Sequence, residues 1–258
     1  MYPYGKVLRY PYGMRQDRPL TVPEAAELLG VLPERVRVLI RRGQLPAERA
    51  HGVWLVDSEA VARRGLTVEL GITGASVRPW SPMVVWAAMR SLDGDDVLLD
   101  ALDRKTRHRL RGRLAVASPA RSLSAVRDRA ALVRVSVHAS RVEGLRALVV
   151  PSGIAGAGLH GHGLSGDTRV DGYLTSDTLE QARTRLGVRD APSGAHLLRV
   201  VADGRLIDGL TVAPRLAVAA DLVDHAAYDG SIDSRVVDTI RNLLDGIART
   251  GAPRATAA

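Results

Sequence analysis

The feature that most constrains the fold is a pair of short helical patterns separated by a tight turn, in the run LTVPEAAELLGVLPERVRVLIRRG. Thr21 and Glu24 have the spacing of a capping box, and Pro23 lies in the first turn, so a helix is predicted to begin there. Gly30 ends this helix, and after a three-residue turn a second helix begins at Pro33.

In both helices the apolar residues recur at helical spacing, which predicts one buried face on each. These faces comprise Ala25, Ala26, Leu28 and Leu29 in the first helix and Val36, Leu39 and Ile40 in the second. Gly43 ends the second helix, whose outer surface is left with Arg35, Arg37, Arg41 and Arg42.

The next segment, LPAERAHGVWLV, is typical of a β-hairpin that turns at His51-Gly52. Asp57 is expected to cap a further helix that runs through Ala62. A helix, a tight turn, a basic helix and a two-stranded wing form a winged helix-turn-helix, predicted here for residues 20–66. Three hairpin residues are expected to close its core: Val53, Trp54 and Leu55.

The run EAAELLGV…RVRVLIRRGQLPA…GVWLV…EAV resembles the excisionase and MerR-type helix-turn-helix family over about Leu20 to Arg64. One position departs from that family, because Leu32 replaces the usual Ser or Thr N-cap of the recognition helix. Such a helix lies in the major groove with its N-terminal half towards the bases. The base-reading candidates are Glu34, Arg35, Arg37 and Val38; Arg41, Arg42 and Gln44 are placed for the phosphate backbone, and His51 for the minor groove or a phosphate. The alternative is that the arginines only solvate a helical face.

Charge is unevenly distributed along the 258 residues. Residues 1–150 hold 25 lysines and arginines against 15 acidic residues, a net charge of +10, whereas residues 151–258 carry −2. This asymmetry favours a polyanion-binding region joined to a region with another task. The chain has no cysteine, which excludes disulfides and thiolate metal sites, and no apolar run long enough to span a bilayer. A soluble, cytoplasmic protein is expected.

Residues 78–130 are predicted to form a helical, arginine-rich segment. Ser81 and Pro82 are typical of a helix start, and the expected core residues of that helix are Trp80, Val84, Val85 and Met89. Further along, six cations fall within ten residues with no acid among them: Arg104, Lys105, Arg107, Arg109, Arg111 and Arg113. On a helix they surround an apolar stripe of Leu110 and Leu114. This pattern favours a polyphosphate-facing element, with a solvated face or a patch for an acidic partner as open alternatives.

Residues 131–250 mix strand and helix patterns, which predicts an α+β domain. The expected strands lie in RAALVRVSVHAS, with Val133, Val135 and Val137 on one face, and in LRALVV, TRVDGYLT and AHLLRVV. Ser176 is expected to cap a helix that Gly187 ends. Two amphipathic helices follow, at about Pro214 to His225 and Asp233 to Arg249. The chain as a whole is therefore predicted to be α+β: a winged helix-turn-helix, a helical basic segment and a mixed C-terminal domain.

The residues from Gly156 to Gly161 match G-x-G-x-x-G, the pattern of dinucleotide-binding loops, but no periodic helix follows Gly161. Ser152 is instead predicted to cap a short helix from Ile154 to His160, in which Gly156 and Gly158 leave no room for a Cβ atom. His160 and His162 lack a third strong metal ligand, and no Walker pattern or nucleophile elbow is present. No catalytic residue, cofactor or metal is therefore predicted, and the protein is expected not to be an enzyme.

The order of these parts resembles the AbiEi-type antitoxins of type IV toxin–antitoxin systems, over about Leu20 to Leu244. The segments that carry the resemblance are RPWSPMVVWAAM…RHRLRGRLA, VVPSGIAGAGLHGHGL with VDGYLTSDTLE, and LLRVV…TVAPRLAVAADLVD. The resemblance implies a non-enzymatic repressor of its own operon that antagonises a nucleotidyltransferase-like toxin. The open alternatives are a stand-alone repressor with a ligand-sensing C-terminal domain and an excisionase-like architectural protein.

The two ends of the chain are predicted to lie outside the folded part. Residues 1–19 repeat Tyr-Pro-Tyr-Gly and are predicted to form a flexible arm, and residues 251–258 a disordered tail. The arm would stack on nucleic acid, bind a partner, or precede a true start at Met14. No long coiled-coil pattern is present, so a monomer or weak dimer is expected. A dimer would bind inverted repeats in double-stranded DNA, expected in its own promoter.

Overall fold

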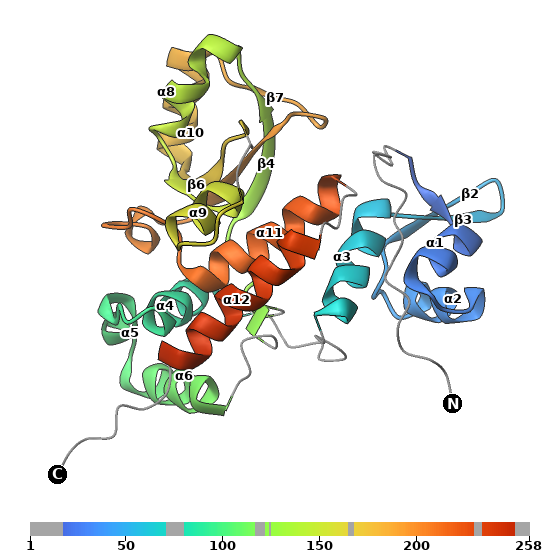
Figure 1. Cartoon of the computed structure of the whole chain (residues 1–258), viewed down its shortest axis with the longest axis horizontal. Helices are drawn as coiled ribbons and strands as arrows, with labels where there is room; N and C mark the ends of the chain where they lie inside the picture. The colour runs from blue at the N-terminus through green and yellow to red at the C-terminus, as the bar shows by residue number, and fades with distance from the viewer. Residues whose placement is uncertain are drawn as a thin grey trace. The chain divides into compact units, whose positions relative to one another are not determined.

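A computed structural model describes residues 18–70, 80–116, 122–123, 125–164, 168–229 and 234–250. The predicted arm lies almost entirely, and the predicted tail wholly, outside these residues. Contacts group the chain into two compact units: Met1–Thr73 with Val223–Asp238, and Gly74–Leu222 with Thr239–Ala258. The fold is α+β, as predicted, and begins with a helix-turn-helix (Figure 1).

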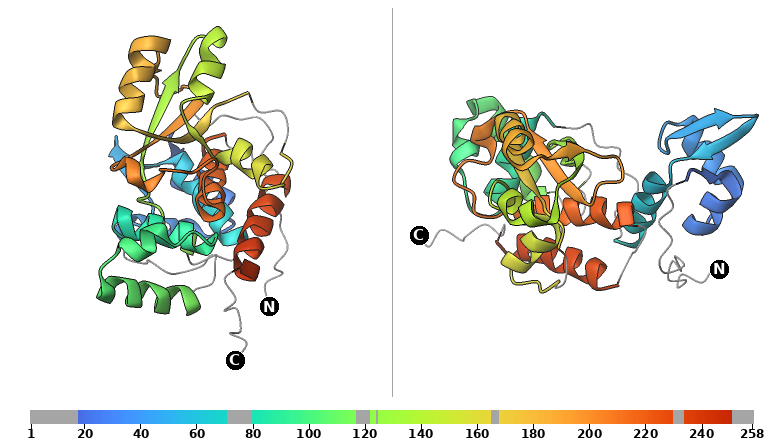
Figure 2. Two further views of the ribbon diagram at one scale, coloured as in Figure 1. Left: turned by 90° about the vertical axis from the view of Figure 1, so that its left-hand side faces the viewer. Right: turned by 90° about the horizontal axis from the view of Figure 1, so that it is seen from above.

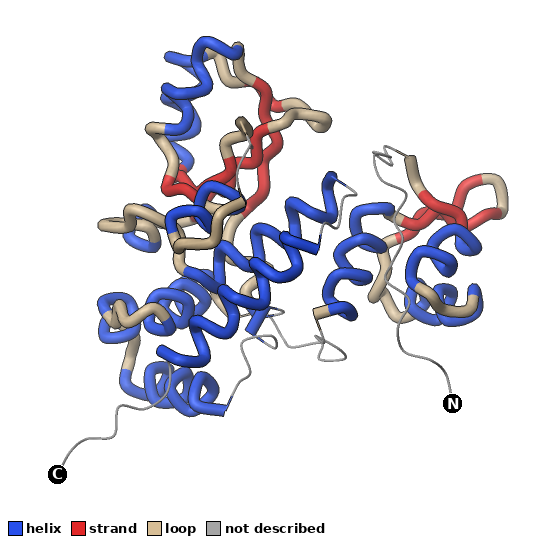
Figure 3. The backbone as a smooth tube through the Cα atoms, in the orientation of Figure 1, coloured by secondary structure: helices blue, strands red, loops and turns tan. Residues whose placement is uncertain are grey.

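The first unit contains three helices and a small antiparallel sheet in the order β1-β3-β2 within residues 18–70 (Figure 3). Its elements are β1 (Leu20–Thr21), α1 (Val22–Leu29), α2 (Pro33–Arg41), β2 (Ala47–Ala50), β3 (Val53–Val56) and α3 (Ser58–Glu69). The helix-turn-helix, the wing and the Asp57 cap of α3 are thereby confirmed, and α3 is longer than predicted.

The capping box at the start of α1 has the expected geometry. The Glu24 amide donates to Thr21 Oγ1 at 3.4 Å, and the Thr21 amide donates to Glu24 Oε2 at 2.7 Å. The side chain of Arg18 donates to Glu24 as well, and together with the Thr21 donors it lowers the pKa of the Glu24 carboxyl to about 2. This cap fixes the direction in which α1 enters the core.

The core of the first unit confirms the predicted helix faces, since Ala25, Val36 and Leu39 are buried. The predicted role of Val53 is wrong, because its side chain is 50% exposed. Side chains alternate across a strand, so Trp54 and the fully buried Val56 face the core while Val53 and the half-buried Leu55 lie on the other face. The sequence prediction placed three consecutive residues on one face, which a strand does not allow.

The second unit combines helices with a five-stranded sheet in the order β5-β6-β8-β4-β7. The β6–β8 pair is parallel, and the other pairs are antiparallel. The helices that precede the sheet are α4 (Pro82–Leu92), α5 (Val97–Ala101) and α6 (Arg104–Val116). The strands are β4 (Ala131–Ser136), β5 (Val150–Pro151), β6 (Asp171–Thr175), β7 (Arg189–Asp190) and β8 (His196–Val201).

Further helices connect and follow these strands. They are η1 (Ala139–Arg141), α8 (Val142–Arg146), α9 (Gly153–Leu159), α10 (Ser176–Leu186), η2 (Gly204–Leu206), α11 (Arg215–Asp229) and α12 (Ser234–Thr250). The end of α11 and the start of α12 are grouped with the first unit. Within this unit, α4, α5 and α6 gather at one end and the sheet with α8 and α10 at the other (Figure 2). The basic helix α6 is therefore remote from the sheet.

Three predictions for the second unit need correction. LRALVV is not one strand, because Leu145 lies in α8 and only Val150–Pro151 pairs with β6. The N-cap of α10 is Thr175, one residue before the predicted Ser176, and its hydroxyl accepts from the Thr178 amide at 3.2 Å. The largest core residue of α4 is Trp86, which is not predicted from the sequence to be buried. Val85 and Met89 are buried as predicted, whereas Trp80 and Val84 are only partly buried.

The glycines of α9 serve packing at one position and not at the other. A Cβ atom on Gly156 would lie 3.0 Å from Val218 Cγ2 and 3.3 Å from the Pro151 carbonyl oxygen, which confirms the predicted lack of room. A Cβ atom on Gly158 meets nothing within 4 Å, so that half of the prediction is wrong. Ser152 precedes the helix, yet its hydroxyl caps no amide and donates to Asp221 instead.

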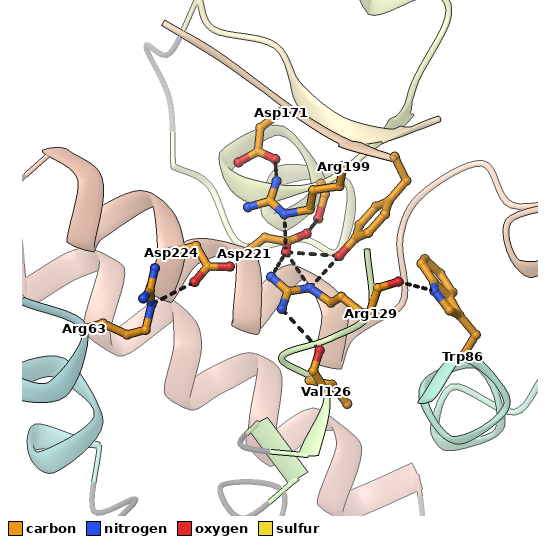
Figure 4. Close-up of polar contacts among 10 residues, drawn as sticks. Arg63, Trp86, Val126, Arg129, Asp171, Arg199, Asp221 and Asp224 are labelled. Carbon is orange, nitrogen blue, oxygen red and sulfur yellow. Dashed lines mark hydrogen bonds and ion pairs between the residues drawn. The ribbon is translucent and has the colours of Figure 1, made fainter. Parts of the chain in front are cut away.

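A cluster of buried charges joins helix α11 to the sheet (Figure 4). Asp221 of α11 pairs with Arg129 and Arg199, and Arg199 pairs with Asp171 at the start of β6. The Tyr173 hydroxyl donates to Asp221 at 3.0 Å and accepts from Arg129 Nε at 2.7 Å. These side chains are at most 6% exposed, so they organise the interior and cannot reach a solute.

Candidate nucleic-acid interface

Helix α2 presents the predicted readout residues on one exposed surface. Its Leu32 N-cap has extended backbone angles but no side-chain hydrogen bond to the helix, so Pro33 and Glu34 start the helix without a hydroxyl cap. Burial of Val36 and Leu39 fixes the rotation of the helix against the core. Seven predicted contact residues lie on or just after the helix, six of them exposed and Val38 half-buried: Glu34, Arg35, Arg37, Val38, Arg41, Arg42 and Gln44.

The single acid on this surface is engaged by two of the arginines. Arg37 Nη1 lies 3.1 Å from one carboxylate oxygen of Glu34, and Arg41 Nη2 lies 3.2 Å from the other. All three side chains are at least half exposed, so water screens these pairs and each contributes little stability. These ion pairs instead fix the positions of two guanidinium groups, which are held beside a carboxylate that repels phosphate.

The first unit contains a further cation that the sequence prediction missed, Arg64 of α3. Arg64 of α3 is half-buried, and its pKa is lowered by desolvation and by the positive charge of Arg35. Two arginines that repel each other gain from a shared anion such as a phosphate. Sequence spacing alone does not indicate this influence of Arg35 on Arg64, since it depends on how α2 and α3 each pack against α1.

The wing tip has the turn that the sequence predicts. His51 has φ +48° and Gly52 φ +82°, the left-handed values of a two-residue hairpin turn, and His51 is exposed. Arg49 is also exposed and lies opposite Trp54 in the β2–β3 register. Arg49 was missed among the contact residues, and strand alternation could not have indicated it, because residues directly opposite each other share a face of the hairpin and Trp54 packs against the core.

The predicted cations of α6 form a second basic surface, which belongs to the second unit. Leu110 is buried and Leu114 half-buried, as the predicted apolar stripe requires. Five basic side chains line an open hollow of about 830 Å³: Arg104, Lys105, Arg107, His108 and Arg111. Arg109 does not line the hollow, and Arg113 lies over the Trp80 ring at 5.9 Å from its centroid.

An acid from the preceding helix partly neutralises this surface. The Asp100 carboxylate lies 3.5 Å from Arg107 and 3.6 Å from Arg111. Arg107 also donates from Nη2 to the carbonyl oxygens of Asp100 and Leu102, at 2.7 and 2.9 Å, and so joins the end of α5 to α6. The local sequence around α6 contains no acid within its cation run, so the contribution of Asp100 follows only from the fold.

Comparison with known proteins identifies the first unit only. Residues 19–64 match the family model described as a helix-turn-helix domain. No curated protein and no solved structure matches the chain. The chain therefore carries a helix-turn-helix domain, and this domain suggests a DNA-binding function.

Two features of the described residues bear on other kinds of site. Among them, no group of three or more His, Asp or Glu side chains is placed to hold a metal ion. In the same part of the chain, no helix combines the length and apolarity required to cross a membrane. His160, half of the predicted H-x-H pair, has its Nε2 atom 2.8 Å from the carbonyl oxygen of Ala213, which explains its position structurally.

Proposed function

We propose that this protein is a sequence-specific DNA-binding antitoxin that represses its own operon. The observation that carries the DNA-binding part is the exposed surface of α2, where Arg35, Arg37 and Arg41 project from a helix whose opposite face is fixed by the core. Arginine donates two hydrogen bonds to guanine in the major groove, and a rigid helix gives such contacts a defined register.

The residues of this interface divide by their position along α2. Arg35 and Arg37 belong to the N-terminal half and are proposed to read bases, whereas Arg41 and Arg42 lie at the C-terminal end and are proposed to contact phosphates. His51 would follow the backbone or the minor groove from the wing tip. Base contacts discriminate between sequences, and phosphate contacts contribute affinity and salt dependence without discrimination.

The test measures binding of the full chain to DNA from its own promoter and to a scrambled duplex of equal length, at several salt concentrations. Arg35→Gln or Arg37→Gln is expected to reduce the preference for the promoter by roughly tenfold, about the 1–3 kcal/mol of a bidentate base contact. Arg42→Gln is expected to weaken binding to both duplexes equally. It should also lower the slope of log affinity against log salt concentration by about 0.9. Unchanged promoter preference in both base-reading variants would refute this interface.

The antitoxin part of the proposal rests on the resemblance of residues 20–244 to AbiEi-type antitoxins. A repressor of this kind is encoded beside the nucleotidyltransferase-like toxin that it antagonises. The discriminating observation is the adjacent gene, followed by co-expression: growth arrest by that gene product should be relieved by the full chain. Relief of growth arrest that persists in the Arg35→Gln variant would show that antagonism of the toxin does not require repression. An adjacent integrase gene would instead favour the excisionase-like alternative.

A further inference from the structure

We propose that the α6 hollow binds consecutive phosphates of a nucleic-acid backbone without reading bases. This inference rests on the proposed DNA-binding function and adds a second contact, made by the second unit. Among the described residues, the hollow is lined by Arg104, Lys105, Arg107, His108 and Arg111, with no carboxylate among them.

The spacing of the cations that line the hollow favours a row of phosphates over a single compact anion. Arg104 and Arg111 lie seven residues apart on one helix, a distance of about 10 Å along its axis. The hollow has a volume of about 830 Å³ and is open to solvent. One phosphate group is much smaller than this span, whereas a nucleic-acid strand presents several phosphates in sequence.

The cations of the hollow differ in how available they are. Arg107 is committed to the α5 carbonyl oxygens, and both Arg107 and Arg111 share the Asp100 carboxylate. In the described part of the chain, Arg104 and Lys105 pair with no carboxylate, and both are exposed. Arg104 and Lys105 are therefore expected to dominate phosphate binding. Asp100 competes with phosphate for Arg107 and Arg111.

These differences in availability predict that two kinds of substitution change the affinity for DNA in opposite directions. The Arg104→Gln/Lys105→Gln double variant should weaken binding to a random-sequence duplex and lower the salt slope by about 0.9 for each lost contact. Asp100→Asn should strengthen that binding and steepen the slope, because it removes the competing carboxylate. Asp100 is 60% exposed, so this substitution leaves the core untouched.

The measurement uses the full chain with Arg35, Arg37 and Arg41 changed to Gln, so that the first unit contributes little. Arg205→Gln is the control for the loss of one positive charge elsewhere in the same unit, because Arg205 is exposed on η2 and paired with Asp203. Arg109→Gln is the control within α6, because Arg109 lies outside the hollow. Circular dichroism of each variant checks that the fold is retained.

The outcomes separate this inference from the proposed function. A smaller salt slope in the double variant, a larger one in Asp100→Asn and no change in Arg205→Gln would support it, even if promoter preference proved absent. The inference would be overturned if the double variant left the salt slope unchanged. It would also be overturned if Arg109→Gln changed the slope as much, for each charge removed, as the double variant does. Competition by inorganic tripolyphosphate at micromolar concentration would overturn it in favour of a free polyphosphate. Poly-glutamate competing as well as DNA would overturn it in favour of an acidic protein partner.

Discussion

At the scale of single residues, Glu34 is the one acid on the exposed surface of α2. Its carboxylate sits between Arg37 and Arg41 on the exposed face, and each oxygen holds one guanidinium group. An acid at this place lowers affinity for any phosphate backbone, while it restrains the two arginines and can accept a hydrogen bond from cytosine. Selectivity gained at the cost of general affinity is what a sequence-specific contact surface requires.

Replacing Glu34 by Gln should therefore tighten binding to a scrambled duplex several-fold and reduce the preference for the promoter sequence. Fluorescence anisotropy at several salt concentrations measures both quantities. Glu143→Gln is a matched control, because Glu143 is also an exposed acid paired with an arginine three residues along, in the second unit. Equal effects of the two substitutions would mean that only net charge matters and that Glu34 has no particular role.

A substitution at Leu32 is expected to raise the stability of α2. Leu32 occupies the N-cap of α2 with φ −73° and ψ 147°, the extended angles that suit Ser or Thr, yet its side chain is 77% exposed and caps nothing. Leu32→Thr should stabilise α2 by about 1 kcal/mol, because its hydroxyl can accept from an amide of the first turn. Slower hydrogen exchange of the α2 amides measures this. Val31→Thr, one position outside the cap, should give no such protection; equal protection would contradict the capping argument.

At the scale of secondary-structure elements, the sequence predicted best where one local pattern decides the outcome. The capping box of α1, the His51-Gly52 turn and the Leu110 stripe of α6 each depend on residues a few positions apart. LRALVV was misassigned because a short apolar run suits a helix and a strand equally well. Electrostatic effects between elements, such as the influence of the Arg35 charge on Arg64, leave no signal in local spacing.

The two glycines of α9 provide a test of packing at this scale. Alanine is favoured over glycine inside a helix by about 0.5–1 kcal/mol, so Gly158→Ala should raise stability by that amount. Gly156→Ala should forfeit the gain, because the new Cβ atom meets Val218, a stiff side chain fully buried in α11, and the Pro151 carbonyl. Urea unfolding of both variants measures the difference. Equal gains would show that α9 moves away from α11 without cost.

At the scale of the whole molecule, the second unit is organised by charges that the sequence did not reveal. Arg129, Asp171, Arg199 and Asp221 are far apart in the chain but form one buried cluster with two charges of each sign. Such a cluster contributes little net stability relative to apolar packing, but the loss of one member leaves an uncompensated charge. Position in the sequence gives no indication of it, because no local motif relates these residues.

Tyr173 makes this cluster sensitive to alkaline pH. Burial raises the pKa of its hydroxyl well above the usual value, and the hydroxyl donates to Asp221. The unfolded chain releases this proton near pH 10, while the folded chain retains it. Above that pH the native state therefore binds more protons than the unfolded state, and its stability should fall by up to about 1.4 kcal/mol per pH unit from this residue until the folded pKa is passed.

The comparison with Tyr173→Phe isolates that contribution. The variant should be less stable at neutral pH, because Asp221 and Arg129 both lose a hydrogen-bond partner, but it should lose stability less steeply above about pH 10. Urea unfolding at a series of alkaline pH values, followed by tryptophan fluorescence, reports both effects, since Trp86 packs edge-on against the Tyr173 ring with the centroids 4.9 Å apart. The remaining tyrosines and arginines are common to both chains, so their titration cancels in the difference. Identical alkaline slopes would mean that Tyr173 ionises within the folded unit and that the cluster around Asp221 is open to water at high pH.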